Sequence, residues 1–168
     1  MKFETARLYI RQLEPGDIPA FDELQGNINV MKYTTGKANS REENEAELKE
    51  IINSYEALSN DRWIMAVVRK SDDELVGTCA VIKNDGNEHE IGYRLLEKYW
   101  GNGYGKELLA GLVSFCLQEM GLNLITASVY SENKASVKML DSSPLNFVAE
   151  VVNEESGHTE RLYRLHKV

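Results

Sequence analysis

The stretch EIGYRLLEKYWGNGYGKELL, residues 90–109, changes character halfway along. Its first part is rich in apolar and aromatic residues, which is typical of a strand, and its last part begins an apolar run with helical spacing. Between them, glycines stand at alternate positions, at Gly101, Gly103 and Gly105. Glycine permits backbone conformations and close approaches that other residues resist. The stretch therefore predicts a strand, a glycine loop and a helix in direct succession.

Known phosphate-binding patterns fit this glycine loop, residues 100–106, to different degrees. A P-loop needs Ser or Thr after its Gly-Lys pair, but Lys106 is followed by Glu107. A dinucleotide fingerprint has G-x-G-x-x-G spacing early in a parallel sheet, whereas this loop has G-x-G-x-G spacing and comes late. A third arrangement needs only amide N–H groups that converge at a helix N-terminus, where Gly103 and Gly105 admit a pyrophosphate and Lys106 adds charge. The loop alone leaves this arrangement and an ordinary tight turn equally open.

Composition limits the class of protein. The chain has 168 residues, is 42% hydrophobic and contains no repeat or linker, which predicts one domain over residues 1–168. Its net charge of -8 disfavours nucleic-acid binding, which depends on Lys and Arg, and modestly favours a cationic partner. The N-terminus is too charged for a signal sequence and no long apolar stretch follows, so we expect a soluble, cytoplasmic protein with no membrane partner.

Neither the cysteines nor the histidines form a metal-binding pattern. Cys79 and Cys116 lie inside apolar runs, as buried cysteines of a reduced protein do. His89, His158 and His166 are scattered and share no spacing with a cysteine pair. We therefore expect no metal.

The first sixty residues predict one strand and two helices. Residues 5–13 alternate in polarity like a half-exposed strand, and Asp17 is expected to cap a short helix that ends at Leu24. Residues 25–39 show no period and are predicted as a loop. The capping box at residues 40–43 then begins a helix with one apolar stripe, formed by Leu48, Ile51, Ile52, Tyr55 and Leu58.

The remainder predicts a mixed sheet. Three β-rich runs, WIMAVV, LVGTCAVI and EIGYRLL, indicate an antiparallel meander with a turn at Asp85 and Gly86 that needs positive φ. An amphipathic helix from Leu108 to Met120, ended by Gly121, a strand at 124–130, a short helix at 133–141 and a hairpin of 147–152 with 161–166 follow. The crossover between 88–95 and 124–130 makes those strands parallel. We predict an α+β fold with a mostly antiparallel seven-stranded sheet, one parallel pair and about four helices.

Two motifs carry a resemblance to a known family. Residues 90–109 and SENKASVKML, residues 131–140, stand at the two ends of one crossover. With the order of elements, they closely resemble the GNAT superfamily of acyl-CoA-dependent N-acetyltransferases. The EIGY and YWGNGYG phrases are similar to the branch that contains the ribosomal-protein N-terminal (alanine/serine) acetyltransferases. The resemblance covers essentially the whole chain, with its specific part at 88–140.

The resemblance implies acetyl-CoA as co-substrate. It places the pyrophosphate on loop amides, at Trp100, Gly101, Asn102, Gly103, Tyr104, Gly105 and Lys106. Trp100 replaces the usual Arg or Gln, a change common in this branch. The pantetheine arm is implied to pair with the backbone of Tyr93, Arg94 and Leu95, where the parallel strands splay and leave polar groups to be satisfied.

A further match, the family's N-x-x-S signature, falls on Asn133 and Ser136. The ordinary roles of such residues are a helix N-cap and a first-turn serine. The resemblance implies that Asn133 contacts coenzyme A and that Ser136 gives a proton to the departing thiolate.

The chemistry also needs a base, because an amine must lose its proton before it attacks a thioester. Glu90 matches an acidic position of several family members and is our candidate base. The alternative interpretation is that Glu90 is only an exposed strand residue beside Glu88. Glu150 is the rival base, and the sequence does not separate the two. A backbone N–H at the splayed strand end is expected to stabilise the oxyanion.

One segment departs from the family pattern. The run SVKMLDSSPLNF, residues 136–147, has about two extra residues and Asn146 in place of a glycine. Asn tolerates positive φ, so we expect the turn to form, with the possibility of a shifted helix end near Ser136.

We predict a GNAT enzyme that acetylates a primary amine, and the acceptor that we favour is a protein or peptide N-terminus. The alternatives are a small-molecule amine (polyamine, amino acid or aminoglycoside) and a non-catalytic acyl-CoA sensor. The loop at 25–39 and the helix after it are expected to form the acceptor wall, in a monomer or homodimer.

Overall fold

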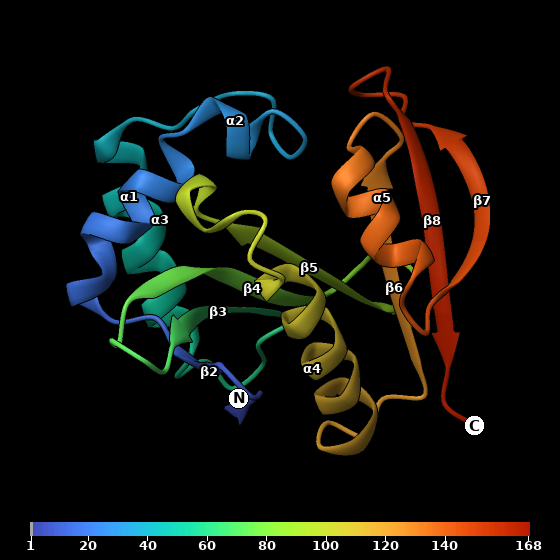
Figure 1. Ribbon diagram of the computed structural model, residues 1–168, viewed down its shortest axis with the longest axis horizontal. Coiled ribbons are helices and arrows are strands. Elements are labelled where there is room, and N and C mark those ends of the chain that lie inside the picture. Colours follow the sequence, from blue (N-terminus) through green and yellow to red (C-terminus); the bar gives the residue numbers. More distant parts are fainter. Residues whose placement is uncertain (1) are drawn as a thin grey trace.

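An eight-stranded sheet with the order β1-β2-β3-β4-β5-β6-β8-β7 forms the centre of the computed structural model, which describes residues 2–168 (Figure 1). The strands are β1 (Phe3–Glu4), β2 (Leu8–Gln12), β3 (Arg62–Arg69), β4 (Leu75–Lys83), β5 (His89–Leu95), β6 (Leu124–Tyr130), β7 (Asn146–Val152) and β8 (Thr159–His166). The helices are α1 (Ile18–Gln25), α2 (Ile28–Met31), α3 (Arg41–Ser54), α4 (Tyr104–Gln118) and α5 (Lys134–Asp141), with 3-10 turns at Pro15–Asp17 and Glu97–Tyr99.

The predicted α+β fold is confirmed, with two additions. The sheet has eight strands and not seven, because Phe3 and Glu4 pair with Ile10 and Tyr9 of β2. Five α-helices replace the expected four, because the predicted loop at 25–39 contains the single turn α2, capped by Asn27. A two-residue strand and a one-turn helix are too short to show a periodic pattern.

We had expected Asp17 to cap α1 through its side chain, but its side chain makes no such hydrogen bond. Its buried carboxylate forms an ion pair with Arg11 (2.8 Å) and accepts a hydrogen bond from the Glu14 amide (2.8 Å). The carboxylate therefore closes the turn before the helix and does not accept hydrogen bonds from the free amides at the start of α1.

Two other local expectations were wrong. Leu58 does not belong to the apolar stripe of α3, because the helix ends at Ser54 and leaves Leu58 fully exposed. In the β4–β5 turn, the residue with positive φ is Asn87 (63°) and not Asp85 or Gly86. The capping box of α3 is confirmed, with Ser40 and Glu43 bonded reciprocally.

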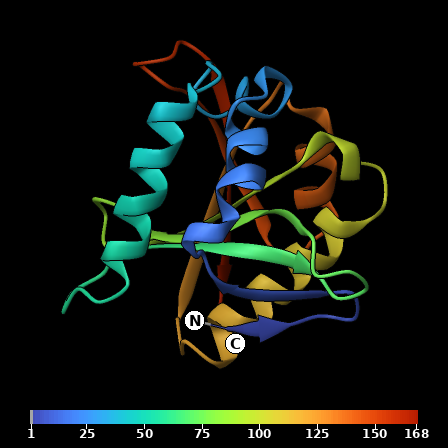
Figure 2. The same ribbon diagram turned by 90° about the vertical axis from the view of Figure 1, so that its left-hand side faces the viewer.

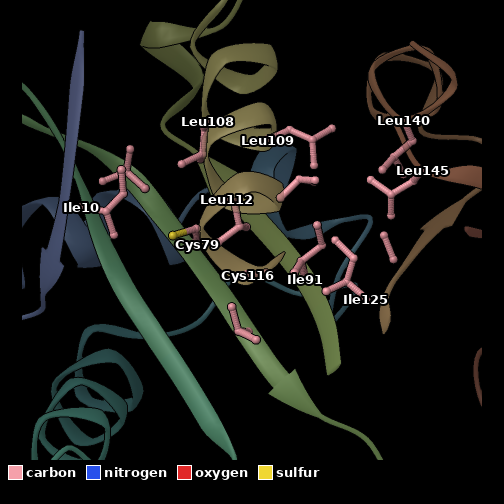
Figure 3. Close-up of a cluster of buried hydrophobic side chains, with 14 of the residues drawn as sticks. Ile10, Cys79, Ile91, Leu108, Leu109, Leu112, Cys116, Ile125, Leu140 and Leu145 are labelled. Carbon is pink, nitrogen blue, oxygen red and sulfur yellow. The ribbon is translucent and has the colours of Figure 1, made fainter. Parts of the chain in front are cut away.

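Helices cover opposite faces of the sheet (Figure 2). On one face α4 and α5 pack over β4, β5 and β6, and Figure 3 shows Leu108, Leu109 and Leu112 of α4 directed at this cluster. On the other face, Phe21 of α1 and Leu48 and Ile51 of α3 cover β3. Along each strand between these layers, the side chains alternate between the two faces of the sheet, so successive residues of β5 point to different faces.

The two cysteines belong to the cluster under α4 (Figure 3). Cys79 and Cys116 are free thiols with 1% and 0% of their surface exposed, which confirms their predicted burial. Burial raises the pKa of the Cys116 thiol to about 12 and raises that of Cys79 as well.

The parallel pair of β5 and β6 is short, and this positions the site. Only His89 with Ile125 and Glu90 with Thr126 are paired between these strands. Beyond Glu90, β5 continues beside β4 alone, and beyond Thr126, β6 continues beside β8 alone. The predicted splay is therefore present, and it leaves facing strand edges whose polar backbone groups have no strand partner.

Within residues 2–168, no helix has both the length and the apolar character needed to cross a bilayer.

Candidate active site

A cavity of about 350 Å³ lies where β5 and β6 diverge. Its lining comes from both halves of the sheet and from α1, α3, α4 and α5, and it includes Glu90, Tyr93, Arg94, Asn133 and Ser136. This volume lies in the range of small-molecule sites. Residues that are 46 positions apart in the sequence, Glu90 and Ser136, thus share one cavity.

Glu90 sits on the face of β5 that looks toward α1 and α3. It stands in one cross-strand row with Ile82 and Thr126. The Ser128 hydroxyl donates a hydrogen bond to Glu90 Oε1 (2.6 Å) across the splay. This bond orients the carboxylate, and Oε2 has no hydrogen-bond partner in the described part of the chain.

Glu150 lies elsewhere. It is exposed on the edge strand β7, opposite Arg161 of β8, and accepts a long hydrogen bond from the Ser131 hydroxyl (3.5 Å). Of the two candidate bases, only Glu90 is among the residues that line the cavity.

Asn133 and Ser136 form the start of α5. The Ser136 amide donates to Asn133 Oδ1 (3.3 Å), so the asparagine is an N-cap, its ordinary role. The half-buried Ser136 lies in the first turn beside Tyr93. Burial raises the pKa of the Tyr93 phenol, and an interaction with the Ser136 hydroxyl works in the opposite direction. The Tyr93 hydroxyl donates a long hydrogen bond to Met139 Sδ (3.9 Å), a contact with α5 that sequence reasoning did not predict.

Serine side chains close the C-terminal end of α5. The hydroxyls of Ser142 and Ser143 donate to carbonyls of the last turn (2.8 and 2.7 Å), and Leu145 is buried. Asn146 begins β7 without positive φ, so the turn expected from Asn146 is wrong. The serine hydroxyls, and not a turn at Asn146, bond the last carbonyls of the helix.

The glycine loop has the conformation that only glycine adopts easily. Gly101 and Gly103 have φ of 76° and 78°, and Gly103 is the N-cap of α4. Space is open where a Cβ of Gly101 would stand. Gly105 differs, because it is helical and a Cβ there would lie 2.8 Å from Met139 Sδ. The backbone of Gly105 therefore closely approaches α5, whereas we had expected it to closely approach a pyrophosphate bound at the loop.

The loop is also held by hydrogen bonds of its own. The Trp100 indole donates to the Leu95 carbonyl (2.9 Å), and Asn102 Nδ2 donates to the carbonyls of Tyr99 and Trp100 (3.0 and 3.1 Å). Trp100 and Asn102 thus fix the loop by side-chain contacts to its backbone.

Contacts from the N-terminal segment, which sequence reasoning missed, anchor the loop. Thr5 Oγ1 and the Arg7 amide donate to Glu107 Oε1 (2.6 and 2.7 Å), and Arg7 Nε donates to Oε2 (2.7 Å). Arg7 Nη1 also donates to the Asn102 carbonyl (2.9 Å), and its guanidinium lies 4.5 Å from the Tyr104 ring centroid. Burial would raise the pKa of Glu107, but these donors outweigh it and lower that pKa.

Arg94 points away from the loop, toward the helices of the other face. Its Nη1 donates to Gln25 Oε1, and Gln25 Nε2 donates to Asn44 Oδ1 (3.1 Å) and Glu47 Oε2 (2.8 Å). Burial lowers the pKa of Arg94. No sequence signal connects these polar residues of α1, α3 and β5, which lie far apart in the chain.

Residues 7–143 match the acetyltransferase (GNAT) domain family. This chain belongs to the GNAT acetyltransferase family. An N-acetyltransferase of Bacillus licheniformis, p20, is 30% identical over 140 residues, covering 82% of this chain and 78% of the relative. The resemblance inferred from the motifs is thereby confirmed, and the chain is a GNAT N-acetyltransferase.

Solved structures share the GNAT fold. A GNAT acetyltransferase from Bacillus anthracis superposes with a TM-score of 0.85 at 22% identity, covering 99% of this chain and 98% of that one. The ribosomal-protein acetyltransferase RimL, in complex with coenzyme A, gives 0.82 at 16% identity, with 99% and 98% covered. A spermidine N-acetyltransferase chimera that includes Vibrio cholerae SpeG gives 0.79 at 18%, with 96% of each chain covered.

The residues present fit acetyl-CoA, the co-substrate of GNAT enzymes. A loop with positive φ at Gly101 and Gly103 opens α4, where backbone amides and the helix dipole favour an anion. The splayed edges of β5 and β6 offer backbone donors and acceptors to an extended, amide-bearing arm. Coenzyme A presents its groups in the same order, a pyrophosphate followed by an extended, amide-bearing arm.

Proposed function

We propose that this GNAT enzyme transfers acetyl from acetyl-CoA to the primary amine of a peptide or protein N-terminus, by direct attack on the thioester. One observation carries the proposal: Glu90 and Ser136 line the same cavity at the β5–β6 splay, and β5 leads into the glycine loop at the start of α4. The fold shared with RimL, a ribosomal-protein acetyltransferase, supports this acceptor class.

The co-substrate would be held mainly by backbone. The amides of the loop from Trp100 to Lys106 would bind the pyrophosphate, and the β5 edge at residues 93–95 would pair with the pantetheine arm. Asn133, at the cavity wall, would add a side-chain contact. Bound in this way, acetyl-CoA supplies an acetyl group activated as a thioester.

Protons would move through two side chains. The Glu90 carboxylate, oriented by Ser128, accepts the proton of the acceptor ammonium. An α-amino group has a pKa of about 7.7–8.0, whereas a lysine-like amine has about 10.4, so a peptide N-terminus asks less of this base. A backbone N–H of the unpaired β5 edge stabilises the oxyanion, and Ser136 Oγ gives a proton to the departing thiolate.

A small-molecule amine is the second candidate. The cavity lining includes three carboxylates, from Glu47, Glu90 and Glu160, which would attract a polycation. The spermidine acetyltransferase chimera also shares the fold. For either acceptor we expect an enzyme of the cytoplasm, as a monomer or homodimer.

An acceptor screen tests the proposal. The enzyme and acetyl-CoA are incubated with peptides that differ in their first residues and, separately, with polyamines, amino acids and an aminoglycoside. Release of free thiol and a mass gain of one acetyl group on the peptide amine are expected. Acetylation of a polyamine alone would support the second candidate. Coenzyme A binding without any acetylated product would indicate a sensor and contradict the proposal.

A further inference from the structure

Arg94 differs from the other arginines of the chain in its partners. Within residues 2–168 its hydrogen bond goes to a neutral amide, Gln25, and no carboxylate forms an ion pair with it. Every other arginine forms an ion pair with a carboxylate: Arg7, Arg11, Arg41, Arg62, Arg69, Arg161 and Arg164. Two arginines line the active-site cavity, and of these Arg62 is paired with Glu47 whereas Arg94 has no such pair.

The surroundings of Arg94 hold it in place through a neutral amide and not through a direct ion pair. Gln25 is 2% exposed and is fixed by Asn44 and Glu47, so its carbonyl oxygen presents one fixed acceptor to the guanidinium. Glu47 is itself paired with Arg62 (3.4 Å). A guanidinium has five N–H donors, and a partly buried cation without a counter-ion is unfavourable. The arginine therefore keeps unused donors at the cavity and has no carboxylate bonded to it among residues 2–168, while the charge of Glu47 acts on it only from a distance.

The position of Arg94 relates it to the reacting end of the site. Glu90 and Arg94 are four residues apart on β5 and lie on the same face, about 13 Å apart along the strand. Arg94 is therefore too far along the strand to act on the reacting nitrogen. It is placed to contact a more distant part of an acceptor whose amine lies at Glu90.

We propose that Arg94 binds a carboxylate of the acceptor, so that the preferred substrates are amines that carry a carboxylate several bonds from the reacting nitrogen. A carboxylate matches the planar fork of a guanidinium and supplies the direct ion-pair partner that Arg94 lacks. A polyamine would bring a second cation to this point, which disfavours it. The inference rests on the proposed function and names its substrate class. The carboxylate has two sources, an acidic side chain near a peptide N-terminus and the terminal carboxylate of a short peptide or amino acid.

Matched ligand pairs test this contact by calorimetry, with enzyme saturated by coenzyme A and no acetyl donor present. One series is a peptide amide with aspartate at its second, third or fourth position, each compared with asparagine at that position. The other is a short peptide with a free C-terminus against its amide. The first series detects an acidic side chain, the second a terminal carboxylate.

We expect at least one carboxylate ligand to bind about tenfold more tightly than its amide, as for a hydrogen bond between charged groups. Arg94→Met should abolish this preference and Arg94→Lys should retain part of it. Arg62→Met is the matched control, because it removes the same charge from the same cavity but from an arginine already paired with Glu47. Thermal unfolding of each variant checks that it is folded.

Two results would overturn the inference: equal binding of every carboxylate and amide pair to the wild type, or an equal loss of preference in Arg94→Met and Arg62→Met. Because binding is measured without transfer, failure of the proposed function is seen separately, as the absence of acetylated product with any amine. Acetylated peptides without a carboxylate preference would contradict the inference alone.

Discussion

The proposed cofactor side of the site, the β5 backbone at residues 93–95 and the loop at 100–106, is built differently from the proposed acceptor side, the cavity wall formed by the side chains around Glu90 and Arg94. The cofactor side depends on backbone: two glycines with positive φ, a helix N-terminus and an unpaired strand edge. The acceptor side depends on side chains that meet from β5, β6, α1 and α3. Backbone features suit a co-substrate common to a family, whereas side chains can change the acceptor without changing the fold.

The largest effect is expected from Glu90→Gln on the acceptor side. Loss of the base should lower kcat/KM for the best amine by about a hundredfold, a typical value for general base catalysis. Steady-state kinetics measures this, and calorimetry should show unchanged coenzyme A binding. Glu150→Gln is the matched control, because Glu150 does not line the cavity. A large loss in Glu150→Gln with none in Glu90→Gln would reverse the assignment of the base.

Ser136→Ala should have a smaller effect, at the junction of the two sides. A thiolate with a pKa near that of cysteine, about 8.5, leaves moderately well without a proton, so we expect about a tenfold lower kcat near neutral pH. The difference from the wild type should shrink as the pH rises above the thiol pKa. An unchanged rate at pH 7 would remove Ser136 as the acid and direct attention to Tyr93.

On the cofactor side, Gly103→Val should weaken coenzyme A binding by about tenfold, because positive φ costs a residue with a side chain about 1–2 kcal/mol. Binding is measured by calorimetry. Gly16→Val is the control, since Gly16 has negative φ and open space where a side chain would stand. Equal affinities for the two variants would show that the loop does not bind the co-substrate.

The smallest effect concerns the anchor of the loop. The lowered pKa of Glu107 means that its contribution to the free energy of unfolding is complete above its ordinary pKa of 4.5 and is lost as the pH falls through the folded value. Glu107→Gln should reduce stability near pH 7 by about 1 kcal/mol and flatten the acid limb of the stability curve. Urea unfolding from pH 3 to 7 measures both, and parallel curves for the two proteins would contradict this account.

The same difference between backbone and side chains decides what the sequence predicted. The glycine spacing and the apolar periods are local signals, so the loop, α4 and the bounds of β6 were predictable. The splay and the roles of Glu90 and Ser136 came only with the family resemblance. Arg7 with Glu107 and Arg94 with Gln25 are 100 and 69 positions apart, and a pairing of two common polar residues over such separations leaves no pattern in one sequence.

Gly105 belongs to a motif that was identified correctly, but phosphate binding alone does not explain why this position is a glycine. It matches the family's phosphate loop, yet a Cβ there would collide with Met139 Sδ of α5. Its spacing in the sequence is the same as that of Gly101 and Gly103, and only the packing of α4 on α5 distinguishes it.

The two buried cysteines bear on the chemical selectivity of the enzyme. Cys79 is among the residues that line the cavity, so a sulfur atom stands close to where a thioester is expected to be handled. Thiolates, not thiols, exchange with thioesters and disulfides. Because burial raises the pKa of both groups, they stay protonated at neutral pH. The protein should therefore neither acetylate itself on sulfur nor form a mixed disulfide with released coenzyme A, and the acetyl group is left for the amine.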